Sequence, residues 1–281
     1  MSIQLIADSG STKAEWCLLE PGKRKKSILT QGINPYFLQP EEIILLLQTE
    51  LVKKLKGVQP DVIHFYGTGC GNPEHQKMLK ACLKKIFPKA KINVDTDILA
   101  AARAVCGSNK GVVCILGTGS NTCFYNGKKI VKNNPGLGYV LGDEGSGAHM
   151  GKKVVQYYLY DTFDPDLMDR FNAKYQTSRV EILESVYKGA LPNRYLANFV
   201  GFLVENRGHY MIENIIEDSF NDYIFHHLYK FKESWTHPIH FVGGVAFGFS
   251  DLLKELCWTY ELSVGNIIQK PMDGLVKFHS S

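Results

Sequence analysis

The fold can be predicted from one stretch of the chain, Val113-Cys114-Ile115-Leu116-Gly117-Thr118-Gly119-Ser120-Asn121. Residues 112–116 form an apolar run that is short enough for a buried strand. The run leads into Gly-Thr-Gly-Ser, where two glycines allow a sharp turn and bring backbone N–H groups close to a ligand. Because residues 122–125 return to a strand-like pattern, we predict a β-hairpin whose tip can hold an anion. An ordinary hairpin turn is the alternative.

A second copy of this pattern lies near the N-terminus, in Ile6-Ala7-Asp8-Ser9-Gly10-Ser11-Thr12-Lys13. It is flanked by expected strands at 3–7 and 14–19, and aligning the glycines places Asp8-Ser9-Gly10-Ser11 over Gly117-Thr118-Gly119-Ser120. Such an internal repeat predicts two related domains that bind one polyphosphate. Only the first copy has a carboxylate at its strand end, Asp8, which could hold Mg²⁺ directly or through water.

The overall composition is that of an ordinary globular protein. The chain has 281 residues, which exceeds a typical single domain, and its net charge of +4 is too small to argue for nucleic acid. Its seven cysteines include no CxxC pair and mostly lie in apolar segments, as expected for reduced thiols in a cytosol. We find no signal peptide and no apolar run long enough to cross a membrane, and therefore expect a cytoplasmic protein.

The first 108 residues predict three strands followed by alternating helices and strands, an order typical of a mixed sheet covered by helices. Asp97 lies where a strand at 92–94 passes into an alanine-rich helix. Ligand sites of open α/β sheets lie at such strand ends, so Asp97 is a candidate catalytic residue. Asp95 is the second candidate, and either carboxylate could instead only cap the helix.

Residues 133–147 contain five glycines and the adjacent acids Asp143 and Glu144, a composition that does not suit a protein core. A helix is expected from about 146 to 160, and the pattern of 166–229 is helical with breaks. A strand at 239–242 then ends in Gly243-Gly244. A glycine pair at a strand end lets a flat ring approach the backbone, which suits a nucleoside. Residues 271–278 predict a last short helix.

These segments carry a resemblance to a known family. Asp8-Ser9-Gly10-Ser11-Thr12-Lys13 and Leu116-Gly117-Thr118-Gly119-Ser120 look like the two phosphate motifs of the acetate/sugar kinase, heat-shock chaperone and actin superfamily. Phe241-Val242-Gly243-Gly244-Val245 looks like its adenosine motif. Gly142-Asp143-Glu144-Gly145-Ser146-Gly147, with Asp97-Ile98-Leu99-Ala100-Ala101-Ala102, is similar to the BadF/BadG/BcrA/BcrD ATPase family and to N-acetylglucosamine kinases. The resemblance spans almost the whole chain with its motifs in order.

The resemblance implies an α/β protein with two ribonuclease-H-like (actin-like ATPase) domains, residues 1–108 and 109–281, and a nucleotide cleft between them. By resemblance, Asp97 is the catalytic base, and Asp8 is the expected ligand of Mg²⁺. The ATP phosphates would contact Ser9, Gly10, Ser11, Thr12, Lys13, Gly117, Thr118, Gly119 and Ser120. The adenosine would contact Gly243 and Gly244, and the sugar would contact Asn34, Asn121, Gly138 and Asp143.

The implied activity is transfer of the ATP γ-phosphoryl group to the 6-hydroxyl of an amino sugar such as N-acetylglucosamine. Leu137 stands where the animal kinase has a tryptophan near the sugar, so N-acetylmuramate and glucosamine stay open as acceptors. A different alternative is an ATPase switch that activates a partner enzyme, but the cysteine motifs of such activators are not found, and Cys70 has no second cysteine nearby. The expected partners are the sugar and ATP, without nucleic acid or membrane, and a homodimer is left open.

Overall fold

A computed structural model of the chain describes residues 2–10 and 13–280. These residues divide after Ser108 into two compact units, of which the first also includes the segment from Pro271 onward. The elements of the first unit are β1 (Gln4–Ser9), β2 (Lys13–Leu19), β3 (Lys26–Gln31), α1 (Pro40–Leu46), η1 (Leu47–Val52), α2 (Lys53–Leu55), β4 (Val62–Gly67), α3 (Pro73–Ile86), β5 (Lys91–Thr96), α4 (Asp97–Cys106) and α14 (Met272–Ser280).

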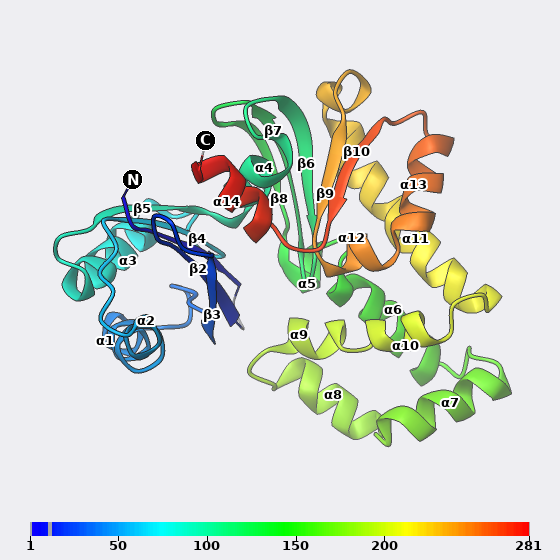
Figure 1. Cartoon of the computed structure of the whole chain (residues 1–281). Helices are drawn as coiled ribbons and strands as arrows, with labels where there is room; N and C mark the ends of the chain where they lie inside the picture. The colour runs from blue at the N-terminus through cyan, green and yellow to red at the C-terminus, as the bar shows by residue number, and fades with distance from the viewer. Residues whose placement is uncertain (1, 11–12, 281) are drawn as a thin grey trace. The chain divides into compact units, whose positions relative to one another are not determined.

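The sheet of the first unit has the strand order β3-β2-β1-β4-β5. The first three strands are antiparallel, and β4 and β5 run parallel to β1, so the carboxyl ends of three parallel strands meet at one edge. One core cluster includes Trp16 and Phe65 and packs against α1 and α3. A second, smaller cluster joins Ile6 on β1 to Ala100 on α4 and Leu275 on α14. The two clusters bury both faces of the sheet (Figure 1).

Helix α14 corrects the predicted domain boundaries, because residues 271–281 were expected in the second domain. The helix packs on α4 and β1 of the first unit. A Cβ on Gly274 would lie 2.4 Å from the carbonyl oxygen of Ala104, so the two helices are in close contact. The hydroxyl of Tyr66 on β4 also lies 2.8 Å from Nε2 of His279 on α14. Such a contact over more than 200 residues of sequence leaves no local pattern to read.

The second unit spans Asn109–Lys270. Its elements are β6 (Lys110–Leu116), β7 (Ser120–Asn126), β8 (Ile130–Pro135), α5 (Gly138–Leu141), α6 (Gly147–Leu159), α7 (Pro165–Tyr175), α8 (Arg179–Tyr187), α9 (Pro192–Ala197), α10 (Val200–Glu205), α11 (Tyr210–His226), η2 (Leu228–Lys230), η3 (Lys232–Trp235), β9 (Ile239–Val242), α12 (Gly244–Gly248), α13 (Ser250–Thr259) and β10 (Val264–Ile268).

The two sheets repeat one topology. The second sheet has the order β10-β9-β6-β7-β8, which is the order of the first when β6 is matched to β1 and β9 to β4. Again the first three strands are antiparallel and the last two run parallel to the first of them. The prediction of an α/β fold built from two related sheets is confirmed. The two glycine-rich stretches are the tips of the β1–β2 and β6–β7 hairpins, as predicted.

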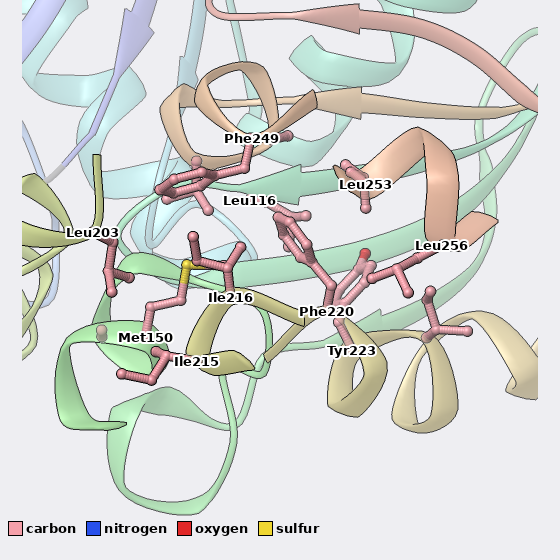
Figure 2. Close-up of a cluster of buried hydrophobic side chains, with 14 of the residues drawn as sticks. Leu116, Met150, Leu203, Ile215, Ile216, Phe220, Tyr223, Phe249, Leu253 and Leu256 are labelled. Carbon is pink, nitrogen blue, oxygen red and sulfur yellow. The ribbon is translucent and has the colours of Figure 1, made fainter. Parts of the chain in front are cut away.

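The core of the second unit is dominated by apolar residues of the helices that lie between β8 and β9 in sequence. Phe220 and Tyr223 of α11 lie with Leu116 of β6 and Phe249 and Leu253 in one buried cluster (Figure 2). Two strands of this unit were not predicted. Residues 133–135 of β8 had been assigned to the glycine-rich stretch, and in β10 a register shift between Val264 and Ile267 interrupts the alternation of side chains that marks a strand.

Candidate functional site

Asp97 is the first residue of α4, directly after the end of β5. The helix cap is Thr96, whose hydroxyl accepts a hydrogen bond from the backbone N–H of Leu99 at 3.3 Å. The alternative that Asp95 or Asp97 is the helix cap is therefore wrong. Oδ1 of Asp97 accepts from the N–H of Ile98 at 2.8 Å, and Oδ2 accepts from the hydroxyl of Thr68 at 2.9 Å. Two hydrogen bonds therefore fix the orientation of this carboxylate.

The electrostatic surroundings distinguish Asp97 from Asp95. Burial raises the pKa of Asp97, and the hydrogen bonds from Thr68 and the backbone oppose part of that rise. Burial also raises the pKa of Asp95, but there the opposing group is the guanidinium of Arg103, whose NH1 lies 3.6 Å from Oδ2. A base works best when its pKa is near the operating pH and no cation occupies it. Asp97 fits this description better than Asp95.

Thr68 connects Asp97 to two other predicted site residues. Its backbone N–H donates to the carbonyl of Ser9 at 2.9 Å, and Ser9 exchanges two hydrogen bonds with the backbone of Ile33, the residue before Asn34. Asn34 is buried, and a Cβ on Gly69 would lie 2.5 Å from its Oδ1. Ser9, Asn34 and Asp97 are therefore brought together at the edge where β1, β4 and β5 end.

The first glycine hairpin is described except for its tip. Asp8 lies at the end of β1, partly buried, opposite Glu15 of β2. The N–H of Gly10 donates to the carbonyl of Lys13 at 3.1 Å and closes the turn. A Cβ on Gly10 would meet only that carbonyl, at 3.8 Å, so the backbone can be approached closely there. The predicted phosphate contacts Ser11 and Thr12 lie outside the described residues.

The second glycine hairpin is held by a helix. The N–H of Gly117 donates to the carbonyl of Gly119 at 3.0 Å, and the carbonyls of Gly117 and Thr118 accept from Gly147 and Ala148, the first residues of α6. The loop is thus attached to α6 through its oxygens. Thr118 is exposed, and a Cβ on Gly117 would meet nothing within 4 Å, which leaves this backbone accessible to a ligand.

Asp143 lies against this second loop. Its carboxylate accepts hydrogen bonds from the backbone N–H groups of Ser120 and Gly138. A Cβ on Gly119 or Gly136 would lie 2.9 or 2.3 Å from its oxygens, so both positions need glycine. Burial raises the pKa of Asp143, and the two N–H groups oppose the rise. β8 and α5 return the chain to Gly119, so Asp143 lies against the second phosphate motif although the two are distant in sequence.

Two buried polar atoms beside Asp143 lack partners in the described part of the chain, Oγ of Ser120 and Oδ1 of Asn121. Both can accept a hydrogen bond, and leaving such an atom buried and unpaired costs about 1–3 kcal/mol. A ligand with hydroxyl donors would satisfy them. Gly138 is exposed next to Asp143 and has a φ of +79°, a conformation that favours glycine. Ser120, Gly138 and Asp143 thus lie in one neighbourhood, and Asn121 directly follows Ser120 on β7.

The glycine pair after β9 has two different surroundings. Gly243 has a φ of +130°, and a Cβ there would lie 2.2 Å from the carbonyl of Leu116 at the end of β6. Packing therefore requires a glycine at this position. Gly244 is exposed and a Cβ on it would meet nothing within 4 Å, so this residue presents bare backbone. Gly243 and Gly244 thus lie beside the strand end that carries the second hairpin.

Cysteine chemistry is disfavoured in the described residues. All seven cysteines are buried and free, and burial raises the pKa of Cys70 to about 12. A thiol with such a pKa carries no free thiolate, the nucleophilic form, near neutral pH. Within residues 2–10 and 13–280, no group of three acidic, histidine or cysteine side chains is placed to hold a metal, and no helix has the length and apolarity needed to traverse a bilayer.

Sequence reasoning missed the residues that hold the site. Thr68 stands in a further glycine-rich stretch, Gly67-Thr68-Gly69 at the end of β4, and no role was assigned to this stretch from the sequence. Gly136 was recognised only as one of a run of glycines. Nothing in the local sequence of Thr68 indicates a partner 29 residues away.

Two sheets of one topology, each with a glycine hairpin between its first two strands, define the class of actin-like ATPases and sugar kinases. The structure is similar to that of a putative N-acetylglucosamine kinase from Porphyromonas gingivalis, with 36% sequence identity, a TM-score of 0.94 and 98% of each chain covered. The chain belongs to the family of that protein.

More distant structures share the fold. A putative N-acetylglucosamine kinase from Chromobacterium violaceum has 15% identity and a TM-score of 0.73, with 99% of each chain covered. A glucokinase of the ROK family from Streptomyces griseus, solved with glucose and AMPPNP, has 15% identity and a TM-score of 0.56, with 99% of this chain and 98% of that chain covered. No protein-family model and no curated protein matched the sequence.

Proposed function

We propose that the protein transfers the γ-phosphoryl group of ATP to the 6-hydroxyl of N-acetylglucosamine. The observation that carries the proposal is the carboxylate of Asp97, fixed by Thr68 at the edge where three parallel strands end. Asp97 takes the proton of the 6-hydroxyl as its oxygen attacks the γ-phosphorus, and ADP leaves with the electrons of the broken P–O bond. The membership in the family of a putative N-acetylglucosamine kinase supports the choice of acceptor.

The sugar contacts are assigned by their chemistry. Asn34 in the first unit, and Asn121 and Asp143 in the second, offer buried or partly buried oxygens that accept from hydroxyl groups. The unpartnered Oδ1 of Asn121 lies on the strand that begins with Ser120, whose N–H holds Asp143. Gly138 adds exposed backbone at the same place. A polyhydroxylated ring would satisfy the Oδ1 of Asn121, which lacks a partner in the described residues and which an apolar ligand would leave unpaired.

The nucleotide contacts follow from the bare backbone of the glycine loops. We assign Ser9, Gly10 and Lys13 in the first hairpin and residues 117–120 in the second to the phosphates by their place in the glycine-rich loops, and Ser11 and Thr12 belong to the same proposal. Gly243 and Gly244 are assigned to the adenosine. Asp8 would hold Mg²⁺, which binds proteins through one or two carboxylates and takes its other ligands from phosphates and water. Held there, the ion would supply positive charge that offsets the charge on the transferring phosphoryl group.

The proposal is tested with a panel of amino sugars in a coupled assay for ADP, with the product identified by mass spectrometry. We expect turnover with N-acetylglucosamine that requires ATP and Mg²⁺, and a phosphate on the 6-oxygen. Asp8→Asn should lose most of this turnover while nucleotide binding without metal changes little. Turnover with N-acetylmuramate or glucosamine alone would move the acceptor, and ATP hydrolysis without any phosphorylated sugar would favour the switch protein. An anaerobic visible absorption spectrum is an independent test of the alternative that the protein is an ATPase switch.

A further inference from the structure

The end of helix α11 holds the loop that carries Asp143. A Cβ on Gly145 would lie 2.7 Å from Cβ of Tyr223, so the loop backbone packs directly on the helix. Nε2 of His227, the residue that caps the helix, lies 3.0 Å from Oε2 of Glu144. The rings of Tyr223 and His227 stack, with centroids 4.8 Å apart and planes 19° apart. His227 is only 4% exposed, so this contact is inside the protein.

The hydrogen bonds around His227 fix where its proton lies. Nδ2 of Asn134 lies 3.2 Å from the backbone carbonyl of His226, which can only accept, and also 3.2 Å from Nδ1 of His227. The amide nitrogen therefore donates to both, and Nδ1 is the unprotonated acceptor. Nε2 must carry the proton, and its N–H donates a hydrogen bond to Oε2 of Glu144. Burial raises the pKa of Glu144, but the hydrogen bond from His227 and other favourable contacts outweigh it, and the net pKa is lowered.

The same helix end is anchored on the strands beside Asn121. Thr122 of β7 and Asn134 of β8 are cross-strand partners. The hydroxyl of Thr122 lies 2.5 Å from the hydroxyl of Tyr223, while Asn134 binds His227. The stacked rings of Tyr223 and His227 are therefore hydrogen-bonded to Thr122, which follows the proposed sugar contact Asn121, and to Asn134. On its other side, His227 bonds Glu144, which follows the proposed sugar contact Asp143.

We propose that His227 is a positioning residue for amino-sugar binding, because its hydrogen bond to Glu144 holds Asp143 against Gly119 and Gly136. The inference rests on the proposed function. Asp143 has a φ of +58°, in the left-handed region that residues with a side chain rarely adopt. Such a conformation persists only where its surroundings enforce it. Without the anchor at Glu144, the carboxylate of Asp143 loses its fixed direction before the sugar arrives.

The test compares replacements of His227 that remove, keep or displace the N–H donor facing Glu144. The wild type is first shown to phosphorylate an amino sugar. His227→Ala should then raise the KM for the sugar about tenfold to a hundredfold, as misplacement by about 1 Å does, with much smaller changes in kcat and in the KM for ATP. His227→Gln should restore most of the binding, since its amide N–H reaches the place of Nε2. His227→Asn is too short and should stay impaired. His226→Ala, at an exposed neighbour, is the control.

Coupling to Glu144 completes the test. Glu144→Ala should resemble His227→Ala, and the double variant should lose little more than either, because both remove one contact. Equal sugar KM values for His227→Gln and His227→Asn, or additive losses in the double variant, would overturn the proposal. The comparison of His227→Gln with His227→Asn is still valid if His227→Ala does not fold.

Failure of the proposed function has a different signature. In that case the wild type itself phosphorylates no amino sugar, and His227 has no role in binding one. Amide hydrogen exchange over 137–147 then decides whether His227 holds the loop: faster exchange in His227→Ala than in His226→Ala supports the anchor, and equal exchange overturns it.

Discussion

The hydroxyl of Thr68 donates a hydrogen bond to Oδ2 of Asp97 at 2.9 Å. This bond favours the ionised carboxylate, and it opposes the rise of the pKa of Asp97 that burial causes. The backbone N–H of Thr68 donates to the carbonyl of Ser9, and this bond keeps Thr68 in place independently of its side chain. The side chain of Thr68 can therefore be changed to probe the base without moving the loop.

We expect Thr68→Val to shift the acid limb of the kcat/KM profile to higher pH. The base must be ionised, and without the hydroxyl the pKa of Asp97 rises further, so activity is lost earlier as the pH falls. The pH dependence of kcat/KM for the sugar measures this shift. Thr68→Ser keeps the donor and should retain the wild-type limb. If Val and Ser give the same profile, the bond does not act on the base.

Asp97→Asn should lower kcat by about 10²–10⁴-fold, the usual contribution of a general base. The KM for the sugar should change less, since asparagine still hydrogen-bonds a hydroxyl, and ATP binding should persist. Steady-state kinetics and nucleotide titration separate these effects. Asp95→Asn is the matched control on the same segment, and a loss of activity in Asp95→Asn alone would transfer the role to Asp95.

Asp143→Ala should weaken sugar binding by roughly 2–4 kcal/mol, the range for losing a carboxylate that accepts from hydroxyls. Asp143→Ala also places alanine where the backbone has a left-handed conformation, so a control for this backbone effect is needed. Asp161 has a φ of +51° and is exposed in the same unit, and Asp161→Ala should leave the sugar KM unchanged. Because Asp143 lies against Gly119, weakening of ATP affinity alone would reassign Asp143 to the nucleotide.

Gly145→Ala should destabilise the protein more than Gly208→Ala. Both glycines have positive φ values, +70° and +87°, so both variants lose about 1–2 kcal/mol of backbone energy. Only at Gly145 would the added Cβ meet an atom, Cβ of Tyr223 at 2.7 Å, which adds about 1–3 kcal/mol for overpacking. Urea unfolding of the two variants measures the difference. Equal losses would show that Tyr223 can move away from the loop.

Acidification should weaken the first unit through His64 and His279. Their rings stack with centroids 3.7 Å apart. Burial, followed by the charges of Arg103 and Lys91, lowers the pKa of His64 to about 4, and burial, followed by His64 and Arg103, lowers the pKa of His279 to about 3. The unfolded chain takes up these protons near a pH of about 6.5, so between 6.5 and 4 it binds more protons than the folded chain. The free energy of unfolding must fall as the pH drops through this window.

The check is urea unfolding at pH 7.5 and pH 5. His279→Phe keeps an aromatic ring without the titrating nitrogens and should show a smaller fall in stability between the two pH values than the wild type. His64→Phe should act in the same direction. A fall as large in both variants as in the wild type would assign the acid sensitivity to other groups.

The sequence by itself determined the features that depend on neighbouring residues. Apolar runs that end in glycines predicted both hairpins, and the match between the segments around Gly10 and Gly119 predicted two related sheets, because strand ends and sharp turns are set by local conformational preferences. The place of Asp97 was predicted in the same way, since a strand followed by an alanine-rich helix puts its junction at a sheet edge. These predictions needed no knowledge of distant contacts.

Only the tertiary structure decided which residues hold the candidate site. Thr68 beside Asp97, Asp143 against Gly119, and His227 beside Glu144 are separated in sequence by up to 83 residues. The same holds for α14, which belongs with the first unit although the chain passes through the second before reaching it. Such contacts arise when buried faces pack and polar groups must find partners away from water. A local pattern specifies that a group will be buried, and packing selects which distant group becomes its partner.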